Sequence, residues 1–512
     1  MSASKALPCR WPKYPLLYEI NARVWLTELS TRAGRKMTLD QVPPEEIERI
    51  AGLGFHGVWL MGVWTTGPEA VLLARACSDL QDEYRRALPD FTRDDVIGSP
   101  YAVSRYRVSD RLGGPAALAS FRKKLKEQGV RLVLDFVPNH TARDHWLVRE
   151  CPDAFIRGTE EDLRAEPQNF FRTPEGAVLA HGRDPYFPAW TDTAQVNYGQ
   201  PAGREAMMNE LLSIGAQCDG VRCDMAMLLL PEVMQQVWGS RLGSNPMMQS
   251  FWKAAIAEVE RCRPGFLFLA EVYWNLEWQL QQEGFHFTYD KTLYDRLLQT
   301  DYHGVRMHLK ADQEYQNHCA RFVENHDERR ATEAFGSARA RSAAVVTFFC
   351  QGLRLFHEGQ LEGRRVKVPI QLGRRPHETP DVETSEHYRT ILAVLADPIF
   401  QDGVFSLCDV QPAAWHDPSY EALVALSWAR ANSVSGKQDP LGHLIVVNLS
   451  DACARGRIPL PAAAFSAGKH YIFHDRYDGI RYRRDGGELV SPGLYVALEA
   501  HQPHLFEIWA QE

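Results

Sequence analysis

Four short segments of the chain place a carboxylate directly after an apolar run: DFVPNH (135–140), GVRCD (220–224), AEVYW (270–274) and FVENHD (322–327). A single charge there often only ends a strand in water, but four such segments in order indicate a shared site. Three acids at one site suit the cleavage of a glycosidic bond. A retaining enzyme needs one ionised carboxylate as nucleophile and a second, protonated carboxyl as acid. A third anion can stabilise the positive charge of the transition state.

Two of the acids can be given roles from their neighbours in the sequence. Arg222 stands two residues before Asp224, and alternate residues of a strand point to the same side, so its guanidinium would keep that carboxylate ionised as the nucleophile. Glu271 follows the apolar run FLFLA and is flanked by Val272 and Tyr273. These neighbours would disfavour its charged form, which suits a general acid.

Histidines and aromatic rings are the other candidates for holding a sugar. His140 and His326 lie at two of the predicted strand ends, where an imidazole can hydrogen-bond hydroxyl groups. One such histidine is more often structural, but two in equivalent positions favour a function. Trp274 ends the third segment, closely following Glu271, and can stack on a pyranose ring. Tyr186 and Phe187 could do the same, or could pack an inserted segment against the rest of the chain.

The elements that must position these residues alternate between short apolar runs and helical patterns. The clearest unit is a helix that starts near Gly113 and ends at Gly129, followed by an almost wholly apolar strand, 130–137. Eight such units fit within about 390 residues, and the sixth, near FHFTYD (285–290), is the weakest. Because no glycine-rich nucleotide fingerprint is present, we predict a closed TIM (β/α)8 barrel rather than an open sheet.

Two stretches interrupt this rhythm, and the shorter of them, 65–99, is predicted to be an insertion after the second strand. Between 141 and 200 the composition turns to proline, aspartate and aromatic residues, which predicts a loop-rich inserted domain after the third strand. From 393 onward, alternating runs such as HLIVVNLS (443–450) predict a C-terminal antiparallel β-sandwich. The predicted domains are therefore the barrel (1–140 and 201–392), the inserted domain (141–200) and the β-sandwich domain (393–512).

Composition excludes several classes of partner. The 512 residues carry 57 lysines and arginines against 65 acids, a net charge of −8, and no long basic run, so we predict no nucleic-acid partner. The first residues lack the apolar core of a signal peptide, and no stretch is long and apolar enough to span a bilayer, so we expect a cytoplasmic protein without a membrane partner. Ten cysteines without a CxxC pair predict neither a zinc site nor a disulfide framework.

The four segments, in this order, resemble the signature segments of the alpha-amylase family, glycoside hydrolase family 13. GSPYAVSRY (98–106) is similar to the segment after the second strand of that family, and TAQVNY (193–198) to the motif that ends its inserted domain. The resemblance covers most of the chain and implies the same three-part organisation. It implies Asp224 as nucleophile, Glu271 as acid/base and Asp327 as the carboxylate that stabilises the transition state.

The resemblance also implies a set of sugar-binding residues. Arg222, His140 and His326 would bind the sugar at the cleavage point. Asp135 would be a buried orienting residue, and Tyr101 would stack its ring on that sugar. Arg329 and Arg330, which follow the last segment, are predicted to begin a solvated helix.

The chain departs from the family pattern where many members have a lysine–histidine pair after the nucleophile segment. Met227 and Leu228 occupy those positions here, and neither can contact a leaving group or hold calcium. Asn139 matches a family calcium ligand, but without the histidine we predict no metal and no other cofactor.

We therefore predict a retaining alpha-glycoside hydrolase that acts on oligosaccharides or small alpha-glucosides. A transglycosylase, glucosyltransferase or phosphorylase of the same family is the first alternative, because sugar or phosphate could intercept the same covalent intermediate. A non-catalytic carbohydrate-binding or scaffold protein is a remote alternative, disfavoured because all three acids are present. The sequence does not indicate the linkage, the chain length or the oligomeric state.

Overall fold

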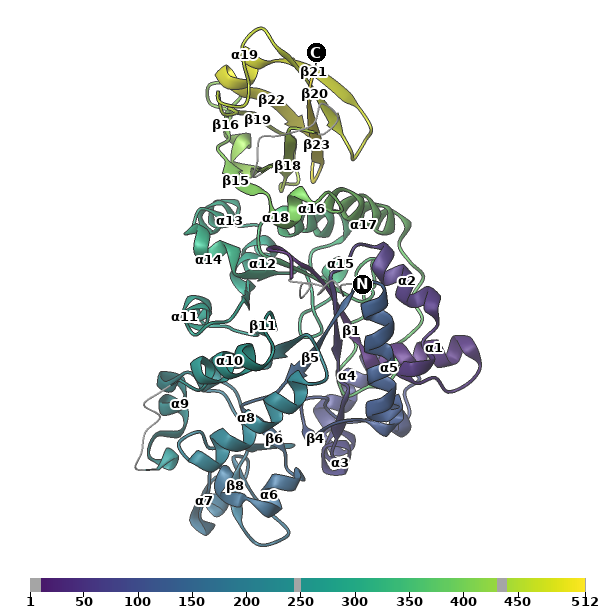
Figure 1. The fold of residues 1–512 in the computed structure, drawn as a ribbon, viewed down its shortest axis with the longest axis vertical. Helices are drawn as coiled ribbons and strands as arrows, with labels where there is room; N and C mark the ends of the chain where they lie inside the picture. Colours follow the sequence, from purple (N-terminus) through teal and green to yellow (C-terminus); the bar gives the residue numbers. More distant parts are fainter. Residues whose placement is uncertain (1–10, 244–249, 431–439, 512) are drawn as a thin grey trace, which may run out of the picture. The chain divides into compact units, whose positions relative to one another are not determined.

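The computed structural model describes residues 11–243, 250–430 and 440–511. Eight strands form a closed parallel barrel, as predicted, and Figure 1 labels β1, β5 and β11 among them. Their order around the barrel is β1 (Leu16–Asn21), β14 (Leu353–His357), β13 (Cys319–Arg321), β12 (Phe287–Tyr289), β11 (Leu267–Ala270), β10 (Gly220–Cys223), β5 (Arg131–Phe136) and β2 (Gly57–Met61). The weakly predicted sixth strand is thus present as β12.

Short apolar strands buried on both faces explain the barrel. Every residue of β2, β10, β11 and β14 is buried, which is the pattern of a parallel sheet covered by helices. Helices α5 (Gly114–Glu127), α8 (Pro201–Gly215), α10 (Phe251–Cys262) and α16 (Ser337–Phe349) connect strands of the barrel. In α5, the apolar positions Leu118, Phe121 and Leu125 recur at helical spacing and are all buried.

Strand β1 is shorter than the largely apolar stretch LLYEINARVWL (16–26) in which it lies. It stops at Asn21, whose side-chain oxygen accepts the backbone N–H groups of Arg23 (3.2 Å) and Val24 (3.4 Å). An asparagine in this position caps a helix, and helix α1 (Ala22–Ala33) begins directly after it. The local capping interaction therefore overrides the apolar pattern of residues 22–26.

The described chain forms two compact units. The first holds 17–243, 250–289 and 366–377, and the second holds 11–16, 290–365 and the rest of the described chain from 378. The segment after β5 belongs to the first unit and contains only short elements: β6 (His140–Ala142), α6 (Trp146–Glu150), α7 (Glu160–Ala165), β7 (Phe170–Arg172), β8 (Val178–Ala180) and β9 (Thr193–Gln195). That this segment is a separate domain stays a prediction.

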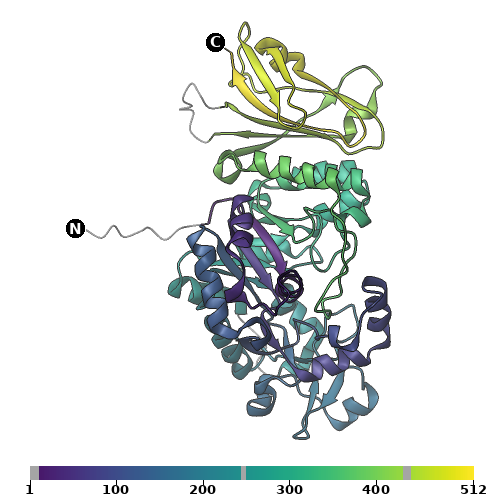
Figure 2. The ribbon, with the colours of Figure 1, turned by 90° about the vertical axis from the view of Figure 1, so that its right-hand side faces the viewer.

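The C-terminal part of the second unit is a β-sandwich, as predicted. One sheet has the order β15 (Val404–Cys408), β17 (Leu423–Ala429), β18 (Gly442–Asn448), β23 (Pro503–Ala510), β20 (His470–Asp475) and β21 (Arg481–Asp485). The other has the order β16 (Gln411–Pro412), β19 (Ala454–Ile458) and β22 (Leu494–Leu498), and the pairing is antiparallel throughout. Figure 2 shows these strands in light green and yellow. Side chains of both sheets, such as Leu444 and Val496, share one buried core.

None of the helices in the described ranges has the length and apolar character needed to cross a membrane. The nine described cysteines are all free thiols, so the described part of the chain holds no disulfide. Cys9 lies outside the described residues.

Candidate active site

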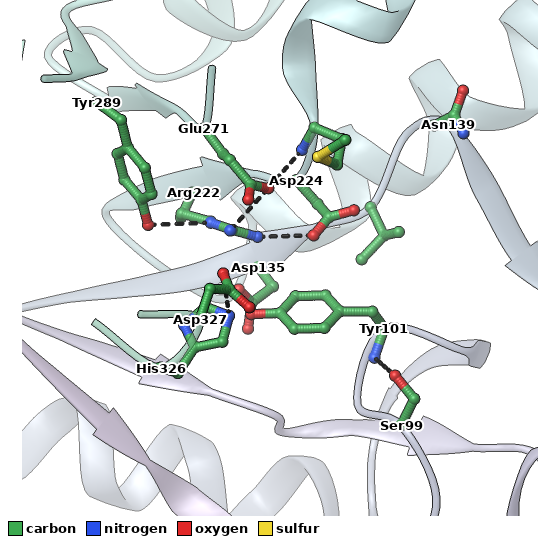
Figure 3. A network of polar contacts seen from close by, with 12 residues as sticks. Ser99, Tyr101, Asp135, Asn139, Arg222, Asp224, Glu271, Tyr289, His326 and Asp327 are labelled. Carbon is green, nitrogen blue, oxygen red and sulfur yellow. Dashed lines mark hydrogen bonds and ion pairs between the residues drawn. The ribbon is translucent and has the colours of Figure 1, made fainter. Parts of the chain in front are cut away.

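Arg222 lies at the centre of a cluster of polar side chains in the first unit (Figure 3). Its side chain is fully buried. Its Nη1 atom lies 2.8 Å from Oδ1 of Asp224, and its Nη2 atom lies 2.8 Å from Oε2 of Glu271. A single guanidinium therefore bridges both carboxyl groups, so the two acids face the same point and do not open onto different surfaces.

The backbone of two neighbouring strands places the acids beside each other. Strands β10 and β11 run parallel with Cys223 opposite Ala270, so Asp224 and Glu271 follow at matching positions. The N–H group of Glu271 donates to the carbonyl of Cys223 (3.0 Å), and the N–H group of Asp224 donates to the carbonyl of Phe136 at the end of β5 (2.9 Å). The ladder of hydrogen bonds thus continues past the strand ends and fixes both acids.

Neighbouring side chains keep the guanidinium of Arg222 positively charged. Burial by itself would lower the pKa of this guanidinium, but Glu271, Tyr101, Tyr289 and Asp224 outweigh burial and raise the pKa well above its ordinary value. Arg222 is therefore a permanent cation between two acids. The contact with Asp224 is the one that the two-residue alternation of the strand predicts.

The surroundings of Glu271 differ from the prediction. Its Oε2 atom also accepts the backbone N–H of Met225 (2.7 Å), and its Oε1 atom accepts the hydroxyl of Tyr273 (2.9 Å). Met225 has a φ of 43°, a left-handed conformation that side chains of its size rarely adopt. The predicted apolar environment is therefore wrong, because a backbone N–H group and the hydroxyl group of Tyr273 both donate to the acid.

Three aromatic rings surround the guanidinium of Arg222. Its Cζ atom lies 5.1 Å from the ring centroid of Trp59, 5.3 Å from that of Tyr101 and 5.7 Å from that of Tyr289. The Nε atom of Arg222 also donates to the hydroxyl of Tyr289 (3.4 Å). Sequence reasoning singled out Tyr101 but missed Trp59 and Tyr289. Tyr289 is the last residue of β12, so applying the strand-end rule to this weakest strand could have found it.

Asp135 and His140 flank the strand end of β5. Oδ1 of Asp135 accepts the indole N–H of Trp59 (3.0 Å), and Oδ2 accepts the backbone N–H of Gly62 (3.2 Å). His140 is buried, and burial lowers its pKa to about 4 despite an opposing hydrogen bond with the backbone of Tyr101. A neutral imidazole at neutral pH has one donor and one acceptor nitrogen, which is suitable for binding a hydroxyl group.

His326 and Asp327 belong to the second unit, after strand β13. The Nε2 atom of His326 lies 2.9 Å from Oδ2 of Asp327. The turn is fixed by Asn325, whose side-chain oxygen accepts the backbone N–H groups of both Asp327 and Glu328 (2.9 Å each). The carboxylate of Asp327 therefore has a defined orientation and keeps 38% of its side-chain surface exposed.

A buried ion pair anchors this turn on both sides. The Nη1 atom of Arg330 lies 2.6 Å from Oε1 of Glu324, and the N–H group of Ala331 donates to Oε2 of the same acid (2.7 Å). Burial would raise the pKa of Glu324, but Arg330 and His357 outweigh burial and lower it. Arg330 is only 4% exposed, so the predicted solvated helix start is wrong for this residue: its charge holds the turn in place.

An exposed group of aromatic rings lies beside the end of β11. Trp274 has a φ of 66°, and its ring meets that of Tyr186 edge-on at 4.9 Å between centroids. Tyr186 is 63% exposed and Phe187 is 68% exposed. Asp184 fixes the backbone of both residues, because its Oδ1 atom accepts their backbone N–H groups at 2.6 and 2.9 Å. Tyr186 and Phe187 are therefore largely exposed, whereas the ring of Trp274 is half-buried and packs against that of Tyr186.

The residues at the family's calcium position do not fit a calcium ion. The side-chain oxygen of Asn139 accepts the Nε2 amide of Gln195 (3.0 Å), and the backbone carbonyl of Asn139 accepts the same amide (2.8 Å). An N–H donor thus points at both oxygens that a cation would need. Met227 and Leu228 are buried and supply no ligand.

Comparisons with known proteins match a large part of this chain. A family model described as "Alpha amylase, catalytic domain" matches residues 44–379. Alpha-amylase MalA of Haloarcula japonica is 25% identical over 288 residues, which are 53% of this chain and 38% of that protein. The chain therefore covers about two fifths of the length of this relative.

Two solved structures share the fold over nearly the whole chain. A noncanonic maltogenic alpha-amylase, AmyB of Thermotoga neapolitana, has a TM-score of 0.68 at 18% identity and covers 98% of this chain and 99% of its own. An alpha-amylase of Geobacillus thermoleovorans, complexed with acarbose, has a TM-score of 0.66 at 15% identity. The match covers 98% of this chain and 100% of that protein's chain. Identities this low are evidence for the fold alone.

Proposed function

Because the chain belongs to the alpha-amylase family of glycoside hydrolases, we propose that it cleaves alpha-glucosidic bonds with retention of configuration. The observation that carries the proposal is the guanidinium of Arg222 placed between the carboxyl groups of Asp224 and Glu271 at 2.8 Å from each. Retention needs two carboxyl groups close together on one sugar. This arrangement supports that requirement.

We assign the two chemical steps to these acids. Asp224 attacks the anomeric carbon and forms a carbon–oxygen bond, while the bond to the glycosidic oxygen breaks and Glu271 gives its proton to that oxygen. In the second step Glu271 takes a proton from water, and the water oxygen displaces Asp224 from the anomeric carbon. Both carboxyl groups then return to their starting states.

Asp327 is proposed as the third acid. Parallel strands of one closed barrel end at the same rim, which is where this fold builds its active sites. Asp327 lies in the turn that follows β13, so we assign it to stabilise the positive charge that develops on the sugar. Its partner His326, together with His140, would hydrogen-bond the sugar hydroxyls.

Tyr101 and Asp135 complete the proposed binding site for the cleaved sugar. Tyr101 lies against the guanidinium of Arg222 and can offer its ring to a pyranose face. Asp135 is already held by Trp59 and Gly62, so we assign it an orienting role within the wall of the site.

The substrate is proposed to be a soluble oligosaccharide or a small alpha-glucoside. Trp274 follows three residues after Glu271, the acid that releases the leaving group, and its half-buried ring meets the exposed ring of Tyr186. Rings of this kind stack on pyranoses. The acarbose complex of the Geobacillus relative is consistent with a carbohydrate ligand. We further propose that the reaction needs no metal, because an amide donor points at the oxygens of Asn139. A cytoplasmic location stays a prediction from the sequence.

Proton NMR during hydrolysis of a panel of alpha-glucosides tests the proposal. We expect the alpha anomer of the product to be released first, followed by slow mutarotation. Early release of the beta anomer would contradict retention. Adding phosphate or an acceptor sugar distinguishes hydrolysis from the phosphorylase and transferase alternatives, because hydrolysis needs neither.

A further inference from the structure

A cavity of about 780 Å³ lies in the first unit. Its walls come from helix α1, strand β3 (Trp64–Thr66), helix α3 (Pro68–Ala76) and the loops around residues 94–97, 109–112 and 373–374. Neither acid of the proposed mechanism lines it. The site proposed above therefore does not account for this cavity.

The walls of this cavity are held by specific contacts. Arg374 donates from Nε to Oδ1 of Asp95 (2.6 Å) and from Nη2 to Oδ2 (3.0 Å). The backbone of the same loop also pairs with this region, since the N–H group of Gly373 donates to the carbonyl of Asp95 and that of Ile97 donates to the carbonyl of Gln371 (2.8 Å each). The loop 366–377 is thus tied to the insertion after β2, and the cavity is part of the folded unit.

The charges around the cavity are unbalanced. Its lining contains five cationic side chains and two carboxylates, although the whole chain has a net charge of −8. The five cations are Arg23, Lys36, Arg75, Arg111 and Arg374. Asp95 already forms an ion pair with Arg374, and Asp94 lies 3.9 Å from Arg75. In the part of the chain that the structure describes, the other three cations have no carboxylate partner.

Arg23 is the most constrained of these three. Its Nη2 atom donates only to backbone carbonyls, those of Gly98 (2.9 Å) and Ile370. Burial, reinforced by the charge of Arg111, lowers the pKa of Arg23 to about 9. A neighbouring like charge destabilises a cation, and a bound anion would relieve that cost.

We propose that this cavity binds the phosphoryl group of a small molecule, with Lys36 and Arg111 as the principal contacts and Arg23 behind them. Arginine and lysine donate charge-assisted hydrogen bonds to phosphate oxygens. Leu26, Met37 and Trp64 supply an apolar wall against which the rest of an ester can pack. The space is ample for a phosphorylated monosaccharide.

Isothermal titration calorimetry on the full chain, in a buffer free of phosphate and sulfate, tests this proposal. We expect saturable binding of inorganic phosphate that weakens as the salt concentration rises. In the Lys36→Gln/Arg111→Gln double variant the affinity should fall about tenfold or more. Arg35→Gln is the matched control, because this neighbouring exposed arginine donates to Gln41 and does not line the cavity.

Glucose 6-phosphate and glucose distinguish the sources of the phosphoryl group. Tighter binding of glucose 6-phosphate than of phosphate identifies an ester as the ligand, and equal binding identifies free phosphate. Absence of saturable phosphate binding, or an affinity that the double variant leaves unchanged, would overturn the proposal. Because binding is measured without turnover, this outcome is independent of the glycosidase assignment.

Discussion

The Nη1 atom of Arg222 lies 2.8 Å from Oδ1 of Asp224, two residues further along the same strand. The same guanidinium reaches Glu271 on the neighbouring strand. A planar guanidinium can hold two carboxyl groups at once in fixed directions, whereas an ammonium group is a point charge. The relative placement of nucleophile and acid therefore depends on one side chain.

Replacing Arg222 by lysine should lower kcat by about 100-fold or more, because lysine cannot hold both carboxyl groups in their present directions. Steady-state kinetics on the best alpha-glucoside measures the effect. Arg122→Lys is the control, because Arg122 forms its ion pair with Asp219 (2.6 Å) rather than with Asp224 or Glu271. An Arg222→Lys variant with nearly unchanged kcat would show that the bridge is not needed.

Removing the ring of Trp274 should raise KM for oligosaccharides about tenfold and leave kcat for a short aryl glucoside little changed, because stacking with the leaving group is lost. Trp274→Ala tests this. Trp415→Ala is a matched control, because Trp415 is 88% exposed and belongs to the other unit. Equal effects of the two substitutions would argue against a binding role for Trp274.

Removal of metals should leave the enzyme unaffected. The amide of Gln195 donates hydrogen bonds to both oxygens of Asn139. We therefore expect dialysis against EDTA to change neither kcat nor Tm. Activity that is lost on dialysis and restored by calcium would contradict this expectation.

Stability should fall as the pH drops below neutrality, in part through His145. Burial, with a contribution from Arg105, lowers the pKa of His145 from 6.5 to about 3. The unfolded chain then binds the proton more readily than the folded one, so this contribution to stability is complete above pH 6.5 and is lost as the pH falls toward 3.

The variant His145→Asn isolates that contribution, because asparagine can still cap helix α6, where His145 accepts the N–H of Leu147 (3.2 Å). Between pH 7 and pH 5 the free energy of unfolding of the wild type should fall by about 2 kcal/mol more than that of the variant. Urea titrations at both pH values measure the difference. Parallel losses in the two proteins would refute the assignment.

The barrel could be predicted from apolar runs that alternate with helical patterns, because a parallel strand buried on both faces leaves a clear sequence signal. Two features could not be predicted from that signal. Asn21 ends β1 by capping a helix, and the left-handed Met225 turns its N–H toward Glu271. Both are local hydrogen bonds of single residues, which apolar periodicity does not report.

Part of the candidate site could be predicted from the sequence for the same reason. Asp224 and Arg222 share one strand, so their contact could be predicted from alternation alone. Tyr289, Trp59 and the buried Arg330 come from other strands or turns, and only the fold brings them to their partners. The polar surroundings of Glu271 were missed because its closest donors lie on a different strand.

Peptide mapping after reaction with a mechanism-based cyclitol inactivator tests the central claim most directly. Incubation with an alpha-glucosyl-configured cyclitol should give one covalent adduct, carried by Asp224, and Asp224→Asn should give no adduct and less than a tenth of the wild-type turnover. An adduct on Glu271 or Asp327, or turnover with no adduct at all, would contradict Asp224 as the nucleophile.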